Sequence, residues 1–345
     1  MMFFIGMSAL IWAGGYVIDV PKQLRLATIG VLYLAILLAL AVLPDPHPLR
    51  VTLDGTFGDW LVAGGAAILI FGYARLVRWL KTKTDSKKPV SSERLFSDTE
   101  LDRYARHIVL RDLGGPGQKR LKEAKVLVIG AGGLGSPALL YLAAAGVGTI
   151  GVIDDDEVDN SNLQRQVIHT DAAIGTPKVF SAEVAMKEQN PAVIVRPYHR
   201  RLAKDFAADL ISDYDLVLDG CDNFDTRYLV NRICAEQGIP LVSGALSQWE
   251  GQITVFDPAN DAPCYECVFP EKPAEGLAPS CAQAGVLGPL PGVIGSMMAV
   301  EAVKVLSGAG TPMHGQMLIY DALYGETRQI RLNRRTDCPT CGKPA

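Results

Sequence analysis

The sequence contains no Gly-Lys-Ser or Gly-Lys-Thr element, and this absence excludes a P-loop ATPase. The sequence also has no excess of basic residues, since its formal net charge is −4 at pH 7. Residues 1–80 hold only nine charged side chains, five basic and four acidic, so residues 81–345 carry the negative surplus. Nucleic acid is therefore not an expected partner, because binding a phosphate backbone requires a basic face. Internal repeats and low-complexity segments are also absent.

Seven cysteines are present, too unevenly placed for the disulfide framework of a secreted protein. Four of them form two Cys-x-x-Cys pairs, a spacing more typical of a metal site in a reducing compartment than of unrelated thiols. Because four thiolates match tetrahedral Zn²⁺, we predict a structural zinc site with no open position. Cys221 and Cys234 are expected to pack in the core. The predicted zinc ligands are Cys264, Cys267, Cys338 and Cys341.

Three apolar stretches open the sequence and predict about three transmembrane helices within residues 1–80. Residues 1–18 and 26–43 each have the length needed to cross the hydrocarbon core without a charged side chain. The third stretch begins at residue 60 and is shorter, but Arg75 and Arg78 can snorkel and extend it to residue 80. The first stretch lacks the basic start and the cleavage site of a signal peptide.

The basic residues predict the orientation of these helices. Lys22 and Arg25 lie between the first two stretches, and further lysines and arginines follow the third one at residues 75–88. The loop at residues 44–59 has Arg50 as its single basic residue. With three crossings, both basic segments face the cytoplasm. We therefore predict a multi-pass protein of the cell inner (cytoplasmic) membrane, with its later residues in the cytoplasm.

After a polar linker at residues 81–96, the pattern of residues 97–345 changes to short apolar runs that alternate with helical stretches. The predicted strands are 125–129, 149–153, 216–218, 240–243, 253–256 and 317–320. The predicted helices are 136–145, 224–237 and 293–306. This alternation predicts an α/β, Rossmann-like domain with a mostly parallel sheet and helices on both faces.

A glycine-rich loop, Gly130-Ala-Gly132-Gly133-Leu-Gly135, joins the first predicted strand to a helix. Such a loop lets backbone amides approach a phosphate at the helix N-terminus. Asp154 ends the next strand, where a carboxylate can bind ribose hydroxyls. Alone, these features fit NAD or FAD enzymes as well as ATP enzymes.

The residues after Asp154 favour a nucleoside triphosphate over a dinucleotide. Arg165 and Lys178 offer cationic partners for the β- and γ-phosphates, which a dinucleotide oxidoreductase does not need. Asp222 follows a later strand and can hold Mg²⁺ beside the phosphates. The remaining candidates for the nucleotide site are Asp156, Ser161, Asn162, Gln166 and Asn223.

Residues 97–342 resemble the MoeB/ThiF/HesA family of the ubiquitin-activating-enzyme superfamily. The matching stretches include Arg103-Tyr-Ala-Arg106, the glycine loop, residues 161–166, Lys178, Asp222-Asn223-x-x-Thr226-Arg227 and both cysteine pairs. Two features depart from the family's pattern. His107 stands where the family usually has Gln, and the membrane segment is foreign to it.

The resemblance implies an ATP-dependent adenylyltransferase. Its substrate would be the C-terminal carboxylate of a small ubiquitin-like sulfur-carrier protein ending in Gly-Gly, of the molybdopterin-synthase type or, alternatively, of the thiamin type. An ionised carboxylate needs no general base, so Arg165, Lys178 and Asp222-bound Mg²⁺ would carry the catalysis. The resemblance also implies a homodimer in which Arg106 serves the partner subunit's phosphates.

Three questions stay open at this point. Cys281 matches a cysteine that links covalently to the carrier in parts of the family, and an inert loop cysteine is an equal alternative. Because no rhodanese segment follows Cys341, we expect a separate sulfur donor. A nicotinamide-dependent oxidoreductase or a membrane scaffold without activity are the alternatives from other classes.

Overall fold

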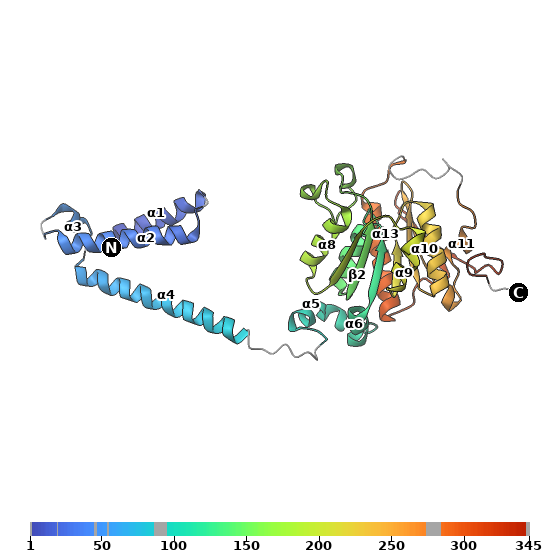
Figure 1. Ribbon diagram of the computed structural model, residues 1–345, viewed down its shortest axis with the longest axis horizontal. Helices are drawn as coiled ribbons and strands as arrows, with labels where there is room; N and C mark the ends of the chain where they lie inside the picture. Colours follow the sequence, from blue (N-terminus) through green and yellow to red (C-terminus); the bar gives the residue numbers. More distant parts are fainter. Residues whose placement is uncertain are drawn as a thin grey trace. The chain divides into compact units, whose positions relative to one another are not determined.

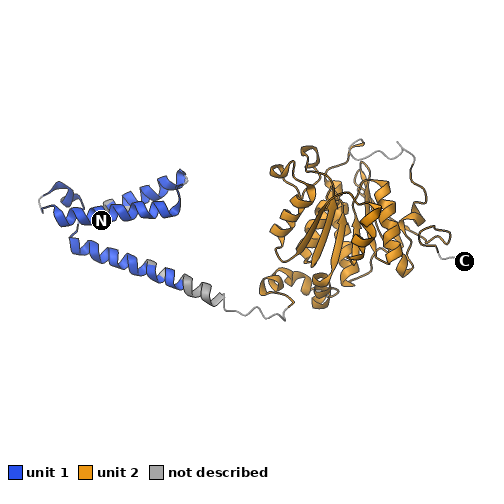
Figure 2. Ribbon diagram, viewed as in Figure 1, with its two compact units in different colours: residues 1–93 blue, residues 94–345 orange. Residues whose placement is uncertain are grey.

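The computed structural model describes residues 2–18, 20–44, 47–53, 55–85, 95–273 and 284–342. It divides into two compact units, Met1–Glu93 and Arg94–Ala345 (Figure 2). Most of the predicted linker lies outside the described residues, except that its first residues continue a helix to Asp85.

The described residues of unit 1 form helices joined by short connections. Its helices are α1 (Met2–Val17), α2 (Lys22–Val42), α3 (Pro48–Leu53) and α4 (Phe57–Asp85). A small core of Ile36, Leu40, Leu53 and Trp60 joins α2, α3 and α4, and the Tyr33 hydroxyl donates a hydrogen bond of 2.5 Å to the Trp60 carbonyl. By length and composition, Lys22–Val42 and Phe57–Val77 could cross a membrane, and only 17% and 6% of these stretches is buried. The short helix α3 was not predicted from the sequence.

Unit 2 contains an eight-stranded sheet with the order β3-β2-β1-β4-β5-β6-β7-β8. The strands are β1 (Lys125–Ile129), β2 (Thr149–Asp154), β3 (Ile194–His199), β4 (Leu216–Asp219), β5 (Leu241–Leu246), β6 (Glu250–Phe256), β7 (Gln316–Asp321) and β8 (Glu326–Arg331). The pairings from β3 to β5 are parallel, and those from β5 to β8 are antiparallel. The predicted α/β fold with a mostly parallel sheet is therefore confirmed.

Helices cover both faces of this sheet (Figure 1). The α-helices in the described part of unit 2 are α5 (Asp98–Ile108), α6 (Gly114–Glu123), α7 (Gly135–Ala145), α8 (Lys178–Gln189), α9 (Lys204–Ser212), α10 (Phe224–Gln237), α11 (Tyr265–Val268) and α13 (Pro289–Ser307). In β1, Val126 and Val128 face the core cluster that contains α7, α8 and α13, whereas Leu127 and Ile129 face the one that contains α9 and α10. Burial on both faces explains why the central parallel strands β1 and β4 are continuous apolar runs.

The two strands that the sequence did not predict, β3 and β8, are the outer strands of the sheet. Every residue of β8 is exposed, so its sequence shows no apolar run. Pro197 lies within β3, where an outer position tolerates the missing backbone donor.

The strand order also locates the site. Consecutive strands continue from β1 to β2 on one side, whereas β4 lies on the other side of β1. In open α/β sheets, ligands bind at the carboxyl ends of the strands where the order reverses in this way.

Candidate functional site

The glycine loop connects β1 to α7 at this switch point. Gly130 has a φ of +94°, and a Cβ there would lie 3.1 Å from the Gly220 carbonyl oxygen. A Cβ at Gly135 would lie 1.9 Å from the Gly130 carbonyl oxygen, so both positions require glycine. No side chain caps the N-terminus of α7, where the Ser136 N–H donates to the Gly132 carbonyl at 2.9 Å and Pro137 has no N–H to satisfy.

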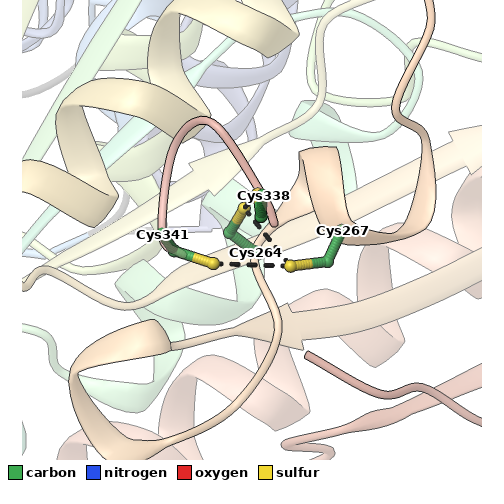
Figure 3. Close-up of side chains that lie close together, drawn as sticks. All are labelled: Cys264, Cys267, Cys338 and Cys341. Carbon is green, nitrogen blue, oxygen red and sulfur yellow. Dashed lines mark hydrogen bonds between the residues drawn. The ribbon is translucent and has the colours of Figure 1, made fainter. Parts of the chain in front are cut away.

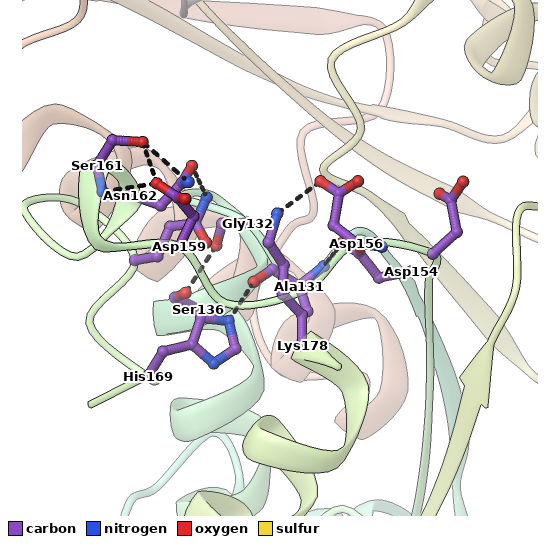
Figure 4. A network of polar contacts seen from close by, with 12 residues as sticks. Ala131, Gly132, Ser136, Asp154, Asp156, Asp159, Ser161, Asn162, His169 and Lys178 are labelled. Atoms are coloured by element: carbon purple, nitrogen blue, oxygen red, sulfur yellow. Dashed lines mark hydrogen bonds and ion pairs between the residues drawn. The ribbon is translucent and has the colours of Figure 1, made fainter. Parts of the chain in front are cut away.

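Two side chains fix Ala131 in the loop from opposite ends (Figure 4). Its N–H donates to Asp154 Oδ2 at 2.7 Å, and its carbonyl oxygen lies 2.9 Å from His169 Nε2. Because a carbonyl only accepts, His169 carries its proton on Nε2 and accepts from the Ser181 hydroxyl at Nδ1, 2.9 Å away. Burial lowers the pKa of His169 and raises the pKa of Asp154. His169 is therefore a neutral support of the loop.

Lys178 begins α8 and lines a cavity at the carboxyl ends of the strands, beside the glycine loop. Its Nζ lies 2.7 Å from Asp156 Oδ2, and its side chain is 6% exposed, compared with 67% for Asp156 (Figure 4). The backbone N–H of Asp156 donates to Asp154 at 2.9 Å. A buried cation is thus held in place by an exposed carboxylate that can move aside for a phosphate.

Arg165 is held by the turn that precedes it. Its Nη2 donates to Asn162 Oδ1 at 3.0 Å, and its Nη1 donates to the Ser161 carbonyl at 3.2 Å. Asn162 Oδ1 also accepts from Gln166 Nε2 at 2.9 Å. Within the described part of the chain, the buried Oε1 of Gln166 has no hydrogen-bond partner. This orphaned acceptor suits a donor on a bound molecule.

The carboxyl end of β4 brings Asp222 to the cavity as an exposed carboxylate. The neighbouring Asn223 uses its side-chain oxygen to cap α10, accepting from the Thr226 N–H at 2.9 Å. Below them, buried Arg227 donates to Asp219 Oδ2 at 2.9 Å and to the Cys221 carbonyl at 2.6 Å. The Arg227 network therefore fixes the loop that carries Asp222.

These groups surround one cavity of about 760 Å³, a size that holds a nucleotide. The predicted residues that line it are Gly130, Gly132, Gly133, Asp154, Asp156, Asn162, Arg165, Gln166, Lys178, Asp222 and Asn223. Ser161 and Arg106 do not line it, and Arg106 is exposed on α5. Cys281 lies outside the described residues. Sequence reasoning missed His169, and it also missed Arg200 and Arg201, which line the cavity after β3.

A second site gathers the two predicted cysteine pairs (Figure 3). Cys264 Sγ lies 3.9 Å from Cys267 Sγ and 3.5 Å from Cys338 Sγ, and Cys267 Sγ lies 3.4 Å from Cys341 Sγ. All four sulfur atoms lie within 4.8 Å of one another and all four residues are buried. Tetrahedral zinc with Zn–S bonds of about 2.3 Å places its sulfur atoms about 3.8 Å apart. The four thiols therefore fit a zinc ion.

Two N–H groups lie near the sulfur atoms, as expected around the thiolates of a metal site. The Arg335 backbone N–H lies 3.4 Å from Cys267 Sγ, and Asn231 Nδ2 lies 3.8 Å from Cys264 Sγ. Asn231 also accepts from the Tyr265 N–H at 2.7 Å. Such donors stabilise thiolates and fix ligand geometry. Cys221 and Cys234 lie in a hydrophobic core cluster as predicted, and burial raises the pKa of both.

Comparison with known proteins gives a family match. The model of the ThiF family matches residues 104–340. The chain is 48% identical over 245 residues to the SAMP-activating enzyme E1 of Haloferax volcanii, covering 71% of this chain and 90% of that protein. It is 49% identical over 247 residues to the sulfur carrier protein adenylyltransferase of Thermus thermophilus, covering 70% and 91%.

One further relative and one solved structure also match. Adenylyltransferase and sulfurtransferase MOCS3 of Mus musculus is 48% identical over 256 residues, covering 74% of this chain and 55% of that protein. The crystal structure of E. coli MccB with MccA-N7isoASN matches with a TM-score of 0.62 and 20% identity, covering 73% and 77%. At that identity the structural match supports the fold alone.

Proposed function

Because the chain belongs to the ThiF family, we propose that it uses ATP to activate a sulfur-carrier protein. As an adenylyltransferase, it transfers the adenylyl group of ATP to the carrier. One observation supports this function above others: the glycine loop, Arg165, Lys178 and Asp222 converge on one cavity at the carboxyl edge of the sheet. An oxidoreductase would have no use for two cations placed there.

The reaction joins two anions, so the site must neutralise negative charge, and Arg165 and Lys178 are placed to do so. A carboxylate oxygen of the carrier's C-terminal glycine attacks the α-phosphorus, the bond to the β-phosphate oxygen breaks, and pyrophosphate leaves. No proton has to be removed, because a C-terminal carboxyl is ionised above a pKa of about 3.7. Arg165, positioned by Asn162, and buried Lys178 neutralise the phosphates, while the Gln166 acceptor receives a donor of the nucleotide.

Two metals complete the proposal. Asp222, an exposed oxygen ligand beside the cations, would hold Mg²⁺, a metal that prefers oxygen ligands and phosphates. Bound there, Mg²⁺ would neutralise phosphate charge. The four buried cysteines would hold Zn²⁺ as a structural ion, since no ligand position is left open.

The partners are inferred from the same family. We propose a molybdopterin-synthase type of carrier ending in Gly-Gly, with a thiamin type as the alternative. A homodimer would explain Arg106, which is exposed on α5 and does not line the cavity of its own chain. Cys281 is proposed to act only after the adenylate has formed.

Unit 1 is proposed to anchor the enzyme in the cytoplasmic membrane. The poor burial of α2 and α4 supports this, because apolar helices of that length need either protein or lipid around them. A reporter fused after Lys88 should behave as cytoplasmic and one inserted near His47 as external. An external reporter after Lys88 would refute the orientation.

The decisive experiment is pyrophosphate–ATP exchange. Exchange should require a carrier protein with a free Gly-Gly carboxylate and should vanish when that terminus is amidated. Arg165→Ala and Asp222→Ala should each reduce the exchange rate on the order of 100-fold. Comparing a molybdopterin-type with a thiamin-type carrier identifies the pathway. Absence of exchange with every such carrier would refute the proposed function.

A further inference from the structure

Two arginines at the carboxyl end of β3 line the nucleotide cavity without an assigned role. Arg200 and Arg201 directly follow His199, the last residue of β3. His199 is paired with Asp154, the last residue of β2. Since β2 lies between β3 and β1, the arginines lie beside Asp154 on the side away from the glycine loop.

Arg200 is stacked on an aromatic ring. Its Cζ lies 3.5 Å from the centroid of the Phe206 ring, the contact distance of two flat groups. Phe206 belongs to the first turn of α9 and packs against a hydrophobic core cluster, so its ring is fixed. The Arg200 N–H donates to the Tyr198 carbonyl at 2.9 Å in the tight turn that ends β3.

The contact between Arg200 and Phe206 lies at the edge of the cavity, because Arg200 lines the cavity and Phe206 does not. The Phe206 ring occupies one face of the guanidinium, and Arg200 as a whole is exposed. Buried Leu202 and Ile153 line the same region and give it apolar walls.

We propose that Arg200 is a stacking platform for the adenine base of ATP. The sheet order arranges the parts of a nucleotide: phosphates at the loop after β1, ribose at Asp154 after β2, and base after β3. A guanidinium is flat and weakly hydrated, so its second face suits a purine, and apolar walls suit a base better than a phosphate. This inference rests on the proposed function only in taking ATP as the nucleotide.

The competing role for Arg200 is a charge contact to phosphate. The two roles differ in their response to lysine, because lysine keeps the charge but lacks the flat face. They also differ in their response to a ligand without a base, ribose 5′-triphosphate. A base platform contributes nothing to the binding of that ligand, whereas a phosphate contact contributes equally to both.

The test measures nucleotide binding to the full chain in detergent by calorimetry. Arg200→Ala and Arg200→Lys should both raise the Kd for ATP, by about 3- to 30-fold, as expected for a stacked cation. Both variants should bind ribose 5′-triphosphate as the unchanged protein does. Arg196→Ala is the matched control, because this exposed arginine of β3 does not line the cavity, and its Kd should be unchanged.

Three results would contradict the proposal that Arg200 stacks on the adenine base. They are unchanged ATP binding by Arg200→Ala, restoration of binding by Arg200→Lys, and an equal loss with ribose 5′-triphosphate. Phe206→Leu gives a second measure, since removal of the supporting ring should raise the Kd for ATP in the same direction. The assay needs no carrier protein. If the unchanged protein bound ATP but catalysed no exchange, the proposed function would be refuted and the role of Arg200 in ATP binding would stand. If the unchanged protein catalysed exchange and Arg200→Ala bound ATP with an unchanged Kd, only the role of Arg200 would be refuted.

Discussion

The nucleotide cavity leaves the carboxylates of Asp156 and Asp222 accessible, whereas the cysteine site buries all four of its thiols. Asp156 is 67% exposed and Asp222 is exposed, but Cys264 is fully buried and its three companions nearly so. In the cavity, Lys178 is held by an ion pair with the exposed Asp156, and Arg165 is held by neutral acceptors. Groups that hold the fold are enclosed by backbone and side-chain donors. The difference agrees with the catalytic role proposed for the cavity and the structural role proposed for the cysteines.

The two sites are nevertheless connected through one segment. Tyr265 lies between Cys264 and Cys267 in the sequence and also lines the nucleotide cavity. Phe269, whose N–H donates to the Tyr265 carbonyl at 2.9 Å, lines it as well. A zinc ion would therefore fix one wall of the cavity.

Removal of zinc should have the largest effect. Cys267→Ser should lose the metal and lower the free energy of unfolding by about 3 kcal/mol or more, because a buried ligand and its ion are lost together. Metal analysis should give about one zinc per unchanged chain, and thermal unfolding of the variant should shift downward. Cys234→Ser is the control that replaces a buried thiol outside the site. A metal-free protein of unchanged stability would contradict the structural role.

Replacement of Asn162 should have a smaller effect and should separate the two sites. Asn162→Ala removes the acceptor that positions Arg165, so the exchange rate should fall about 10-fold, the equivalent of one hydrogen bond to a charged group. The melting temperature and zinc content should stay unchanged. If zinc were lost with this variant, the separation of catalytic and structural roles would be wrong.

The pH dependence of stability should show the smallest effect. Burial places the pKa of His169 below its unfolded value of about 6.5, so both states are neutral above that pH. As the pH falls below 6.5, the unfolded chain binds the proton first, and stability should fall by at most about 1.4 kcal/mol per pH unit. Denaturant unfolding between pH 7 and pH 5 should show a shallower slope for His169→Gln. Equal slopes would show that His169 is not held neutral.

The sequence predicted those parts of the fold and the site in which a single physical requirement determines the residue types. The continuous apolar run of β1 and the glycine loop follow from burial on both faces and from close backbone approach, so both were predicted. The cysteine spacing predicted the ligands because thiolate pairs have few other uses. β8 has no buried face and left no pattern. His169 supports the glycine loop through tertiary packing and Arg200 reaches the cavity through strand order, and no local spacing reveals either.

Helix α13 has a consequence for which apolar helices enter a membrane. Pro289–Ser307 is long and apolar enough to enter a membrane, yet half of this stretch is buried within unit 2. Glu301 is 2% exposed, lies 2.6 Å from Lys304 Nζ, and accepts from the Met313 N–H at 2.9 Å. A charged side chain costs roughly 2.5–3.5 kcal/mol at the centre of an inserting helix. Glu301 and Lys304 lie toward the C-terminal end of α13, so we expect a smaller cost that still makes lipid less favourable for this helix than the sheet, where Glu301 is paired.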